Sequence, residues 1–132
     1  MEQNTQESLA PFFEKDTWTI EEYDQLLEVL ASMRDAAGKL RSELGRLESE
    51  HPEPRGTDAV KIGIGQYLAC RFADALATLS EGTDNKDRRY FQGMCLKQLR
   101  DYEKAAEQFD LAAGRGAEAD RVERQLIEVQ AL

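Results

Sequence analysis

Residues 62–79 read IGIGQYLACRFADALATL, and residues 92–109 read QGMCLKQLRDYEKAAEQF. When Ile62-Gly63 is placed over Gln92-Gly93, later positions coincide in size: Phe72 over Tyr102, Ala75 over Ala105, and Leu79 over Phe109. Small and large residues that match at equal offsets indicate an internal repeat, in which Gly93 follows Gly63 by 30 residues.

The apolar residues around this repeat recur with helical spacing. No stretch shows the alternation of a strand, and glycine-containing segments at Gly82 and at Gly114 to Gly116 interrupt the pattern where helices would end. The sequence therefore predicts an all-α chain. Its helical repeats span residues 57–132 and divide into 57–86, 87–116 and a partial unit, 117–132.

The second copy resembles the tetratricopeptide repeat. It carries that family's residue types at that family's spacings: Gly93, Leu96, Tyr102, Ala105, Phe109 and Ala112. The resemblance implies a short right-handed α-solenoid of antiparallel helix pairs, in which small residues let the helices of a pair approach closely. The copies lie closer together than the family's spacing of about 34 residues. We therefore expect a shortened second helix in the first copy.

Tetratricopeptide arrays bind extended peptides along a concave groove lined by the first helix of each pair. Carried over position by position, the resemblance implies these partner-binding residues: Val60, Ile64, Tyr67, Tyr90, Met94 and Lys97. All except Lys97 are apolar or aromatic. The implied partner is thus a protein or peptide with an apolar or aromatic segment.

Residues 1–18 are predicted to form an extended N-terminal arm. They include the apolar segment Leu9-Ala10-Pro11-Phe12-Phe13 and then Trp18. Pro11 disfavours helix at the residue before it, which predicts a non-helical Ala10. An apolar arm could occupy an apolar groove, either within one protomer or across a dimer.

Residues 19–50 are predicted to form one long amphipathic helix. Thr19 and Glu22 make a capping-box pattern at its start, and His51-Pro52 ends it. Apolar residues recur at alternating intervals of three and four: Tyr23, Leu26, Leu30, Met33, Ala37, Leu40, Leu44 and Leu47. We expect this seam to pack on the repeats as an N-terminal cap, with a homodimer through residues 19–50 as the alternative.

Composition restricts the possible partners. The 132 residues carry a formal net charge of −9, with 41% hydrophobic and 33% charged residues. An acidic chain repels phosphate backbones, so nucleic acid and anionic membranes are not expected partners. The sequence shows neither a signal peptide nor a membrane-spanning run, and two cysteines are compatible with a reducing compartment; a cytoplasmic protein is expected.

The sequence offers no set of residues for bond chemistry. His51 is the single histidine, and Cys70 and Cys95 are interpreted as small core residues within helices. Gly63-Ile64-Gly65 lacks the third glycine of a dinucleotide-binding motif. We therefore predict no catalytic residue, no cofactor, no metal site and no enzymatic activity.

These features favour a non-enzymatic protein–protein interaction module, an adaptor or scaffold that binds a partner segment in an apolar concave groove. Two alternatives remain open at this stage. One is an acidic, dimeric chaperone that resembles the repeat-containing chaperones of secretion systems. The other is the N-terminal piece of a longer structural solenoid that continues past Leu132.

Overall fold

The computed structural model describes residues 9–131. Within that range the regular elements are eight helices: α1 (Ala10–Phe13), α2 (Ile20–Ala31), α3 (Ala36–Glu50), α4 (Gly56–Leu68), α5 (Phe72–Leu79), α6 (Lys86–Gln98), α7 (Tyr102–Gly114) and α8 (Ala119–Ala131). The prediction of an all-α chain is confirmed for these residues.

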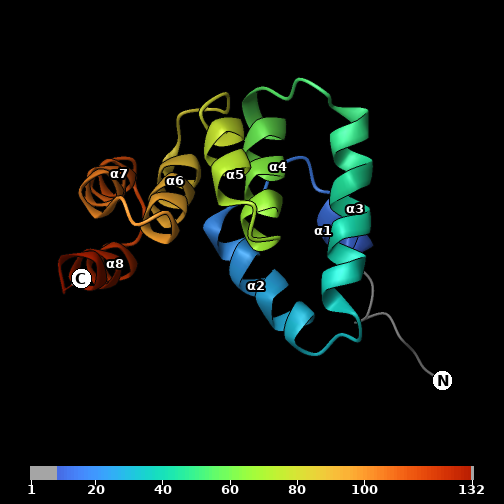
Figure 1. The fold of residues 1–132 in the computed structure, drawn as a ribbon, viewed down its shortest axis with the longest axis horizontal. Helices are drawn as coiled ribbons and strands as arrows, with labels where there is room; N and C mark the ends of the chain where they lie inside the picture. Colours follow the sequence, from blue (N-terminus) through green and yellow to red (C-terminus); the bar gives the residue numbers. More distant parts are fainter. Residues whose placement is uncertain (1–8, 132) are drawn as a thin grey trace.

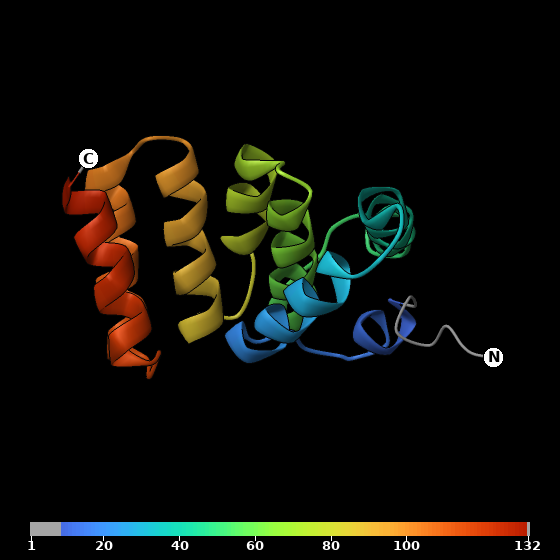
Figure 2. The ribbon, with the colours of Figure 1, turned by 90° about the horizontal axis from the view of Figure 1, so that it is seen from below.

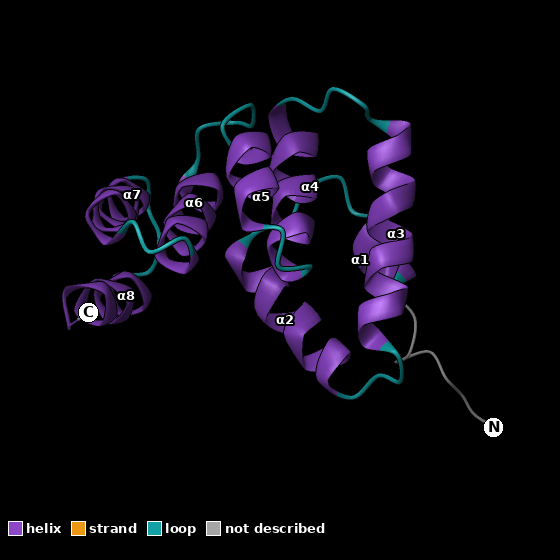
Figure 3. Ribbon diagram, viewed as in Figure 1, coloured by secondary structure: helices purple, strands orange, loops and turns teal. Residues whose placement is uncertain are grey.

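Successive helices from α3 to α8 pack against one another (Figure 1). Short loops join them, so neighbours run in opposite directions (Figure 3). Figure 2 shows α2 crossing one side of α4, with α1 close to α3. The largest fully buried side chains come from α2, α3, α4, α5, α6 and α7: Leu26, Leu44, Ile62, Ile64, Leu79, Tyr90, Phe91, Cys95 and Phe109.

The α4–α5 and α6–α7 hairpins turn with the same backbone geometry. Cys70 and Arg100 both adopt the left-handed conformation, with φ of 64° and 67°. The next amide, of Arg71 or of Asp101, donates at 2.9 Å to the carbonyl five residues earlier. This hydrogen bond is that of a Schellman helix end. The 30-residue repeat of the sequence is therefore also a repeat of structure.

Cys70 corrects one interpretation of the sequence. Its side chain is exposed at the corner between α4 and α5, whereas the sequence predicted a residue inside a helix and packed in the protein core. α4 ends at Leu68 and α5 begins at Phe72, so the residue between them must reverse the chain. Cys95, by contrast, is buried as predicted.

Each hairpin closes on a glycine that faces a large side chain. A Cβ added to Gly63 would lie 2.6 Å from Leu79, and one added to Gly93 would lie 2.6 Å from the Phe109 ring. Both distances are far below van der Waals contact, so only glycine fits at either position. The atoms nearest to the position of the missing Cβ belong in each hairpin to the large residue, Leu79 or Phe109.

The first hairpin is the shorter one. α5 has 8 residues and α7 has 13, which confirms the prediction of a shortened second helix in the first copy. The loop after α5 returns to the start of α4, where the Gly56 amide donates to Glu81 and the Thr83 amide donates to Gly56. These bonds fix the loop that leads into α6.

The single helix predicted over residues 19–50 is wrong in its continuity, because two helices, α2 and α3, occupy this range. α2 ends at Ala31, and Ser32 to Asp35 turn the chain before α3 begins. Both predicted ends are confirmed: Thr19 and Glu22 form the capping box, and α3 ends at Glu50.

The bend lets both halves of the apolar seam pack on the helical repeats, the first half on α6 and the second half on α4. Leu44 of α3 lies over Gly65 of α4, where an added Cβ would be 2.9 Å away. Tyr23 of α2 instead contacts Phe91 of α6. The sequence pattern is local and continuous, so it carries no sign of a bend that these tertiary contacts impose.

The extended arm predicted for residues 1–18 is also corrected for its described part. Ala10–Phe13 form the short helix α1, with Pro11 in its first turn. Proline is accepted there because the first amides of a helix have no intrahelical partner. Residues 1–8 lie outside the described residues, as does Leu132.

Candidate functional site

The six residues predicted to line an open groove are mostly inside the protein. Val60, Ile64, Tyr67 and Tyr90 are buried, and Met94 is partly buried. Lys97 is also partly covered, and its ammonium group pairs with Glu128 and donates to Gln125 of α8 at 2.9 Å. Because most of these side chains are covered, they do not line an open groove in this conformation. Tyr67 lies beside Tyr23 of α2, and Tyr90 lies beside Arg121 of α8.

Five residues of α4, α6 and α8 hold the first turns of α2. They are Tyr67, Lys86, Asp87, Phe91 and Arg121, and together we call them the α2-binding face. Only Tyr67 belongs to the predicted set.

The start of α2 is bound through its backbone. The Ile20 amide donates to a carboxylate oxygen of Asp87 at 2.8 Å, and both residues are buried. The first amides of a helix lack intrahelical acceptors and carry a partial positive charge, so a carboxylate is a suitable partner. The capping box of Thr19 and Glu22 satisfies the neighbouring amides at 3.2 Å.

An aromatic cluster forms the apolar part of the face. The Tyr23 ring meets the Phe91 ring edge to face, with centroids 4.8 Å apart, and lies 6.2 Å from the Tyr67 ring. Such arrangements are favourable beyond the area that they bury. Burial raises the pKa of both Tyr23 and Tyr67.

Charged pairs surround the aromatic cluster. Arg121 of α8 pairs with Asp24 of α2, and its guanidinium lies 5.6 Å from the centroid of the Tyr90 ring. Lys86 of α6 lies 3.3 Å from a carboxylate oxygen of Glu21. The acidic first turns of α2 therefore meet basic side chains from two helices.

The segment before α2 is attached to α4 in a similar way. The buried ammonium group of Lys61 donates to the carbonyl oxygens of Phe13 and Lys15, the latter at 2.7 Å. Burial lowers the pKa of Lys61. Residues 9–13 were considered as a possible occupant of the groove; the residue that reaches Tyr67 and Phe91 is Tyr23 of α2.

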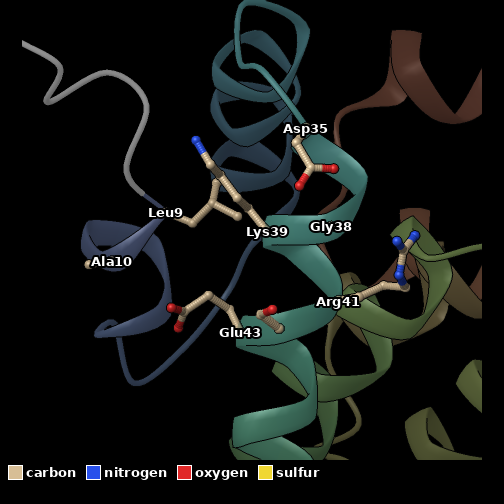
Figure 4. Close-up of a pocket in the computed structure, with 8 residues that line it drawn as sticks. Leu9, Ala10, Asp35, Gly38, Lys39, Arg41 and Glu43 are labelled. Atoms are coloured by element: carbon tan, nitrogen blue, oxygen red, sulfur yellow. The ribbon is translucent and has the colours of Figure 1, made fainter.

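Two clefts flank the bend between α2 and α3. One, of about 680 Å³, lies between α1 and α3; Figure 4 shows Asp35 beside Gly38, with charged side chains of both signs along α3. The other, of about 360 Å³, is more apolar and lies inside the bend. We call it the elbow cleft, and its lining is Leu30, Ala36, Ala37, Leu40, Arg41, Leu68, Ala69 and Cys70.

Sequence reasoning missed Lys86, Asp87, Phe91 and Arg121. Apolar spacing does not single out the three charged residues, and it marks Phe91, which is completely buried, only as a core residue of α6. One available signal was charge: Glu21 and Asp24 are acidic, and Lys86 and Arg121 are basic. That signal is weak in a chain in which a third of the residues are charged.

Across residues 9–131, no three His, Cys, Asp or Glu side chains are grouped so that they could hold a metal ion. Over the same range, every helix is too short or too polar to cross a membrane. Comparisons of the chain with protein-family models, with curated proteins and with solved structures found no match.

Proposed function

We propose that this chain is a non-enzymatic protein–protein interaction module, an adaptor or scaffold, that receives a helical segment of a partner on the α2-binding face. The observation that carries the proposal is the contact of Tyr23 with Phe91 and Tyr67. A face that holds one amphipathic helix has the shape and chemistry to hold another.

The tetratricopeptide resemblance supports this proposal through details of the hairpins. The left-handed corners at Cys70 and Arg100, and the glycines that face Leu79 and Phe109, recur at the same interval. Stacked units of this kind expose the first helix of each pair along one side. The α2-binding face takes its residues from the first helices α4 and α6 and from α8.

The face favours a particular partner. Asp87 suits a helix whose first amides are free, and Lys86 and Arg121 suit acidic residues in its first turns. Phe91 and Tyr67 suit an aromatic side chain between those acidic residues. The partner that we propose is therefore an acidic amphipathic helix with an aromatic residue near its start, which takes the place of α2.

Affinity capture with the intact chain and three variants tests this function. Asp24→Ala weakens α2 and leaves the face intact, so a partner that competes with α2 should be captured more strongly. Arg121→Glu alters the face and should reduce affinity for that partner by at least ~10-fold. Arg124→Glu makes the same charge change at an exposed position of α8 and serves as the matched control.

The decisive result is a protein that depends on Arg121 and not on Arg124, confirmed with the purified partner by calorimetry. If every captured protein responds equally to Arg121→Glu and Arg124→Glu, the α2-binding face is not the interaction site.

A further inference from the structure

The first turns of α2 are attached to α6 and α8 by a hydrogen bond, a ring contact and an ion pair. Ile20, Tyr23 and Asp24 bind Asp87, Phe91 and Arg121, and none of these contacts involves α3. The preceding residues are anchored by Lys61 of α4. A second copy of this chain presents an identical face, so residues 9–31 of one copy could make the same contacts on another.

The connection between α2 and α3 contains no helix-breaking residue, although the amides of Ser32 and Met33 donate to the carbonyls of Val29 and Leu30 and close the last turn of α2. Ser32-Met33-Arg34-Asp35 contains neither glycine nor proline, and its last residue, Asp35, has a φ of 50°. Residues other than glycine adopt this left-handed conformation rarely, and aspartate does so less rarely than most. At Asp35 the bend therefore carries a small backbone cost, which a helical conformation of the same four residues would release.

The apolar seam continues through the bend without a change of register. Leu30, Met33 and Ala37 keep the alternating intervals of four and three that run from Tyr23 to Leu47. In the bent conformation Ala37 is exposed, and Leu30, Ala37 and Leu40 border the elbow cleft. A straight helix over residues 20–50, about 45 Å long, would restore one continuous seam.

Straightening removes α2 from its own face, because α3 stays fixed on α4 through Leu44 and Gly65. The released α2 then carries exposed apolar and acidic groups, whose complement is uncovered on a second copy that has opened in the same way. We propose that two copies of this chain exchange residues 9–31, so that α2 of each lies on the α2-binding face of the other while Ser32 to Asp35 become helical. This exchange concerns identical chains and does not depend on whether another protein uses the face.

A charge exchange at one pair tests the proposal. Asp24→Arg places like charges at the pair with Arg121, and Arg121→Asp does the same with Asp24. Within either variant, both the closed monomer and the exchanged homodimer contain the repulsive pair. In the exchanged heterodimer of the two variants, every pair is again one acid with one base.

The two variants should therefore form a heterodimer when mixed, in preference to either homodimer. Native mass spectrometry distinguishes the three dimers, because the two substitutions change the chain mass in opposite directions. The chain that carries both Asp24→Arg and Arg121→Asp is the matched control; its internal pair is restored, so it should gain no advantage from mixing. Circular dichroism verifies that each variant is folded.

Substitution of Asp35, in the connection between α2 and α3, supplies an independent measurement in case a charge variant fails to fold. Asp35→Ala favours the straight helix, whereas Asp35→Gly removes the strain of the bend and disfavours helix. At equal and high protein concentration, the dimer-to-monomer ratio of Asp35→Ala should exceed that of Asp35→Gly by at least ~5-fold.

Two results overturn the exchange. One is a folded mixture that stays monomeric. This result overturns the exchange even if the variants bind a synthetic peptide of residues 19–31, because the face then accepts a free helix but not a second copy. The other is a dimer that forms equally well from either charge variant alone or that is indifferent to the residue at position 35.

Discussion

At the scale of single residues, the glycines of the two hairpins determine how closely their helices approach. Gly93 leaves the space that the Phe109 ring fills, and Gly63 leaves the space that Leu79 fills. Glycine in a helix interior costs about 1 kcal/mol relative to alanine. Here that cost is offset by the packing of a large, completely buried side chain against the opposite backbone.

We expect Gly93→Ala to lower the free energy of unfolding by about 1–3 kcal/mol, because the new methyl group would overlap the Phe109 ring. Urea-induced unfolding, followed by circular dichroism, measures the change. Gly45→Ala is the control: nothing lies within 4 Å of an added Cβ there, so this variant should be more stable by up to about 1 kcal/mol. Equal effects of the two substitutions would show that the hairpin contact is unimportant.

At the scale of the elements, the first turns of α2 are attached to α6 and α8 through a few polar and aromatic contacts. The Asp87 carboxylate accepts from the Ile20 amide and lies 3.2 Å from the Lys86 ammonium group. A buried amide that loses its acceptor is costly because water cannot replace the lost bond. Asp87 therefore controls how firmly the first turn of α2 is held.

Asp87→Ala should reduce the free energy of unfolding by about 1–3 kcal/mol. It should also accelerate amide hydrogen exchange in α2 more than in α7, which hydrogen-exchange mass spectrometry resolves by peptide. Asp110→Ala, at an exposed position of α7, is the comparison and should leave the exchange of α2 unchanged. Uniform acceleration in α2 and α7 would mean that Asp87 supports the whole fold rather than the attachment of α2.

The elements differ in how far sequence could predict them. The repeat was predictable because Gly93, Ala105 and Phe109 record contacts within one hairpin, and those contacts depend on local spacing. The bend at Asp35 was not, because it results from contacts between distant segments, such as Leu44 with Gly65. Most of the α2-binding face could not be predicted for the same reason. Arg121, for example, pairs with Asp24, a residue far from it in the sequence, only once the chain has folded.

At the scale of the whole molecule, Asp84 links the loop between the two hairpins to both helices of the second hairpin. It lies in the loop between α5 and α6, and its carboxylate binds Arg89 of α6 and Arg115, which follows α7. The hydrogen bonds and positive charges of these two arginines hold the pKa of Asp84 far below its usual range. The group is partly exposed, so its contribution to stability is moderated by solvent.

This depressed pKa predicts how the stability of the molecule depends on pH. Asp84 binds a proton more readily in the unfolded chain, so its contribution is complete above the ordinary aspartate pKa of 3.8 and is lost as pH falls below it. From about pH 5 to pH 2, the native protein should therefore lose more stability than Asp84→Asn. Urea unfolding at a series of pH values measures both; parallel pH profiles would contradict this role.

The corner at Cys70 gives the molecule a natural attachment point for a reporter. Its sulfur is exposed, whereas Cys95, the chain's other thiol, is enclosed, and burial raises the Cys95 pKa to about 12. A maleimide dye would thus couple selectively at the border of the elbow cleft without any engineered cysteine. The fluorescence of this dye would report in real time on the separation of α2 from α3, without a change in the amino-acid sequence.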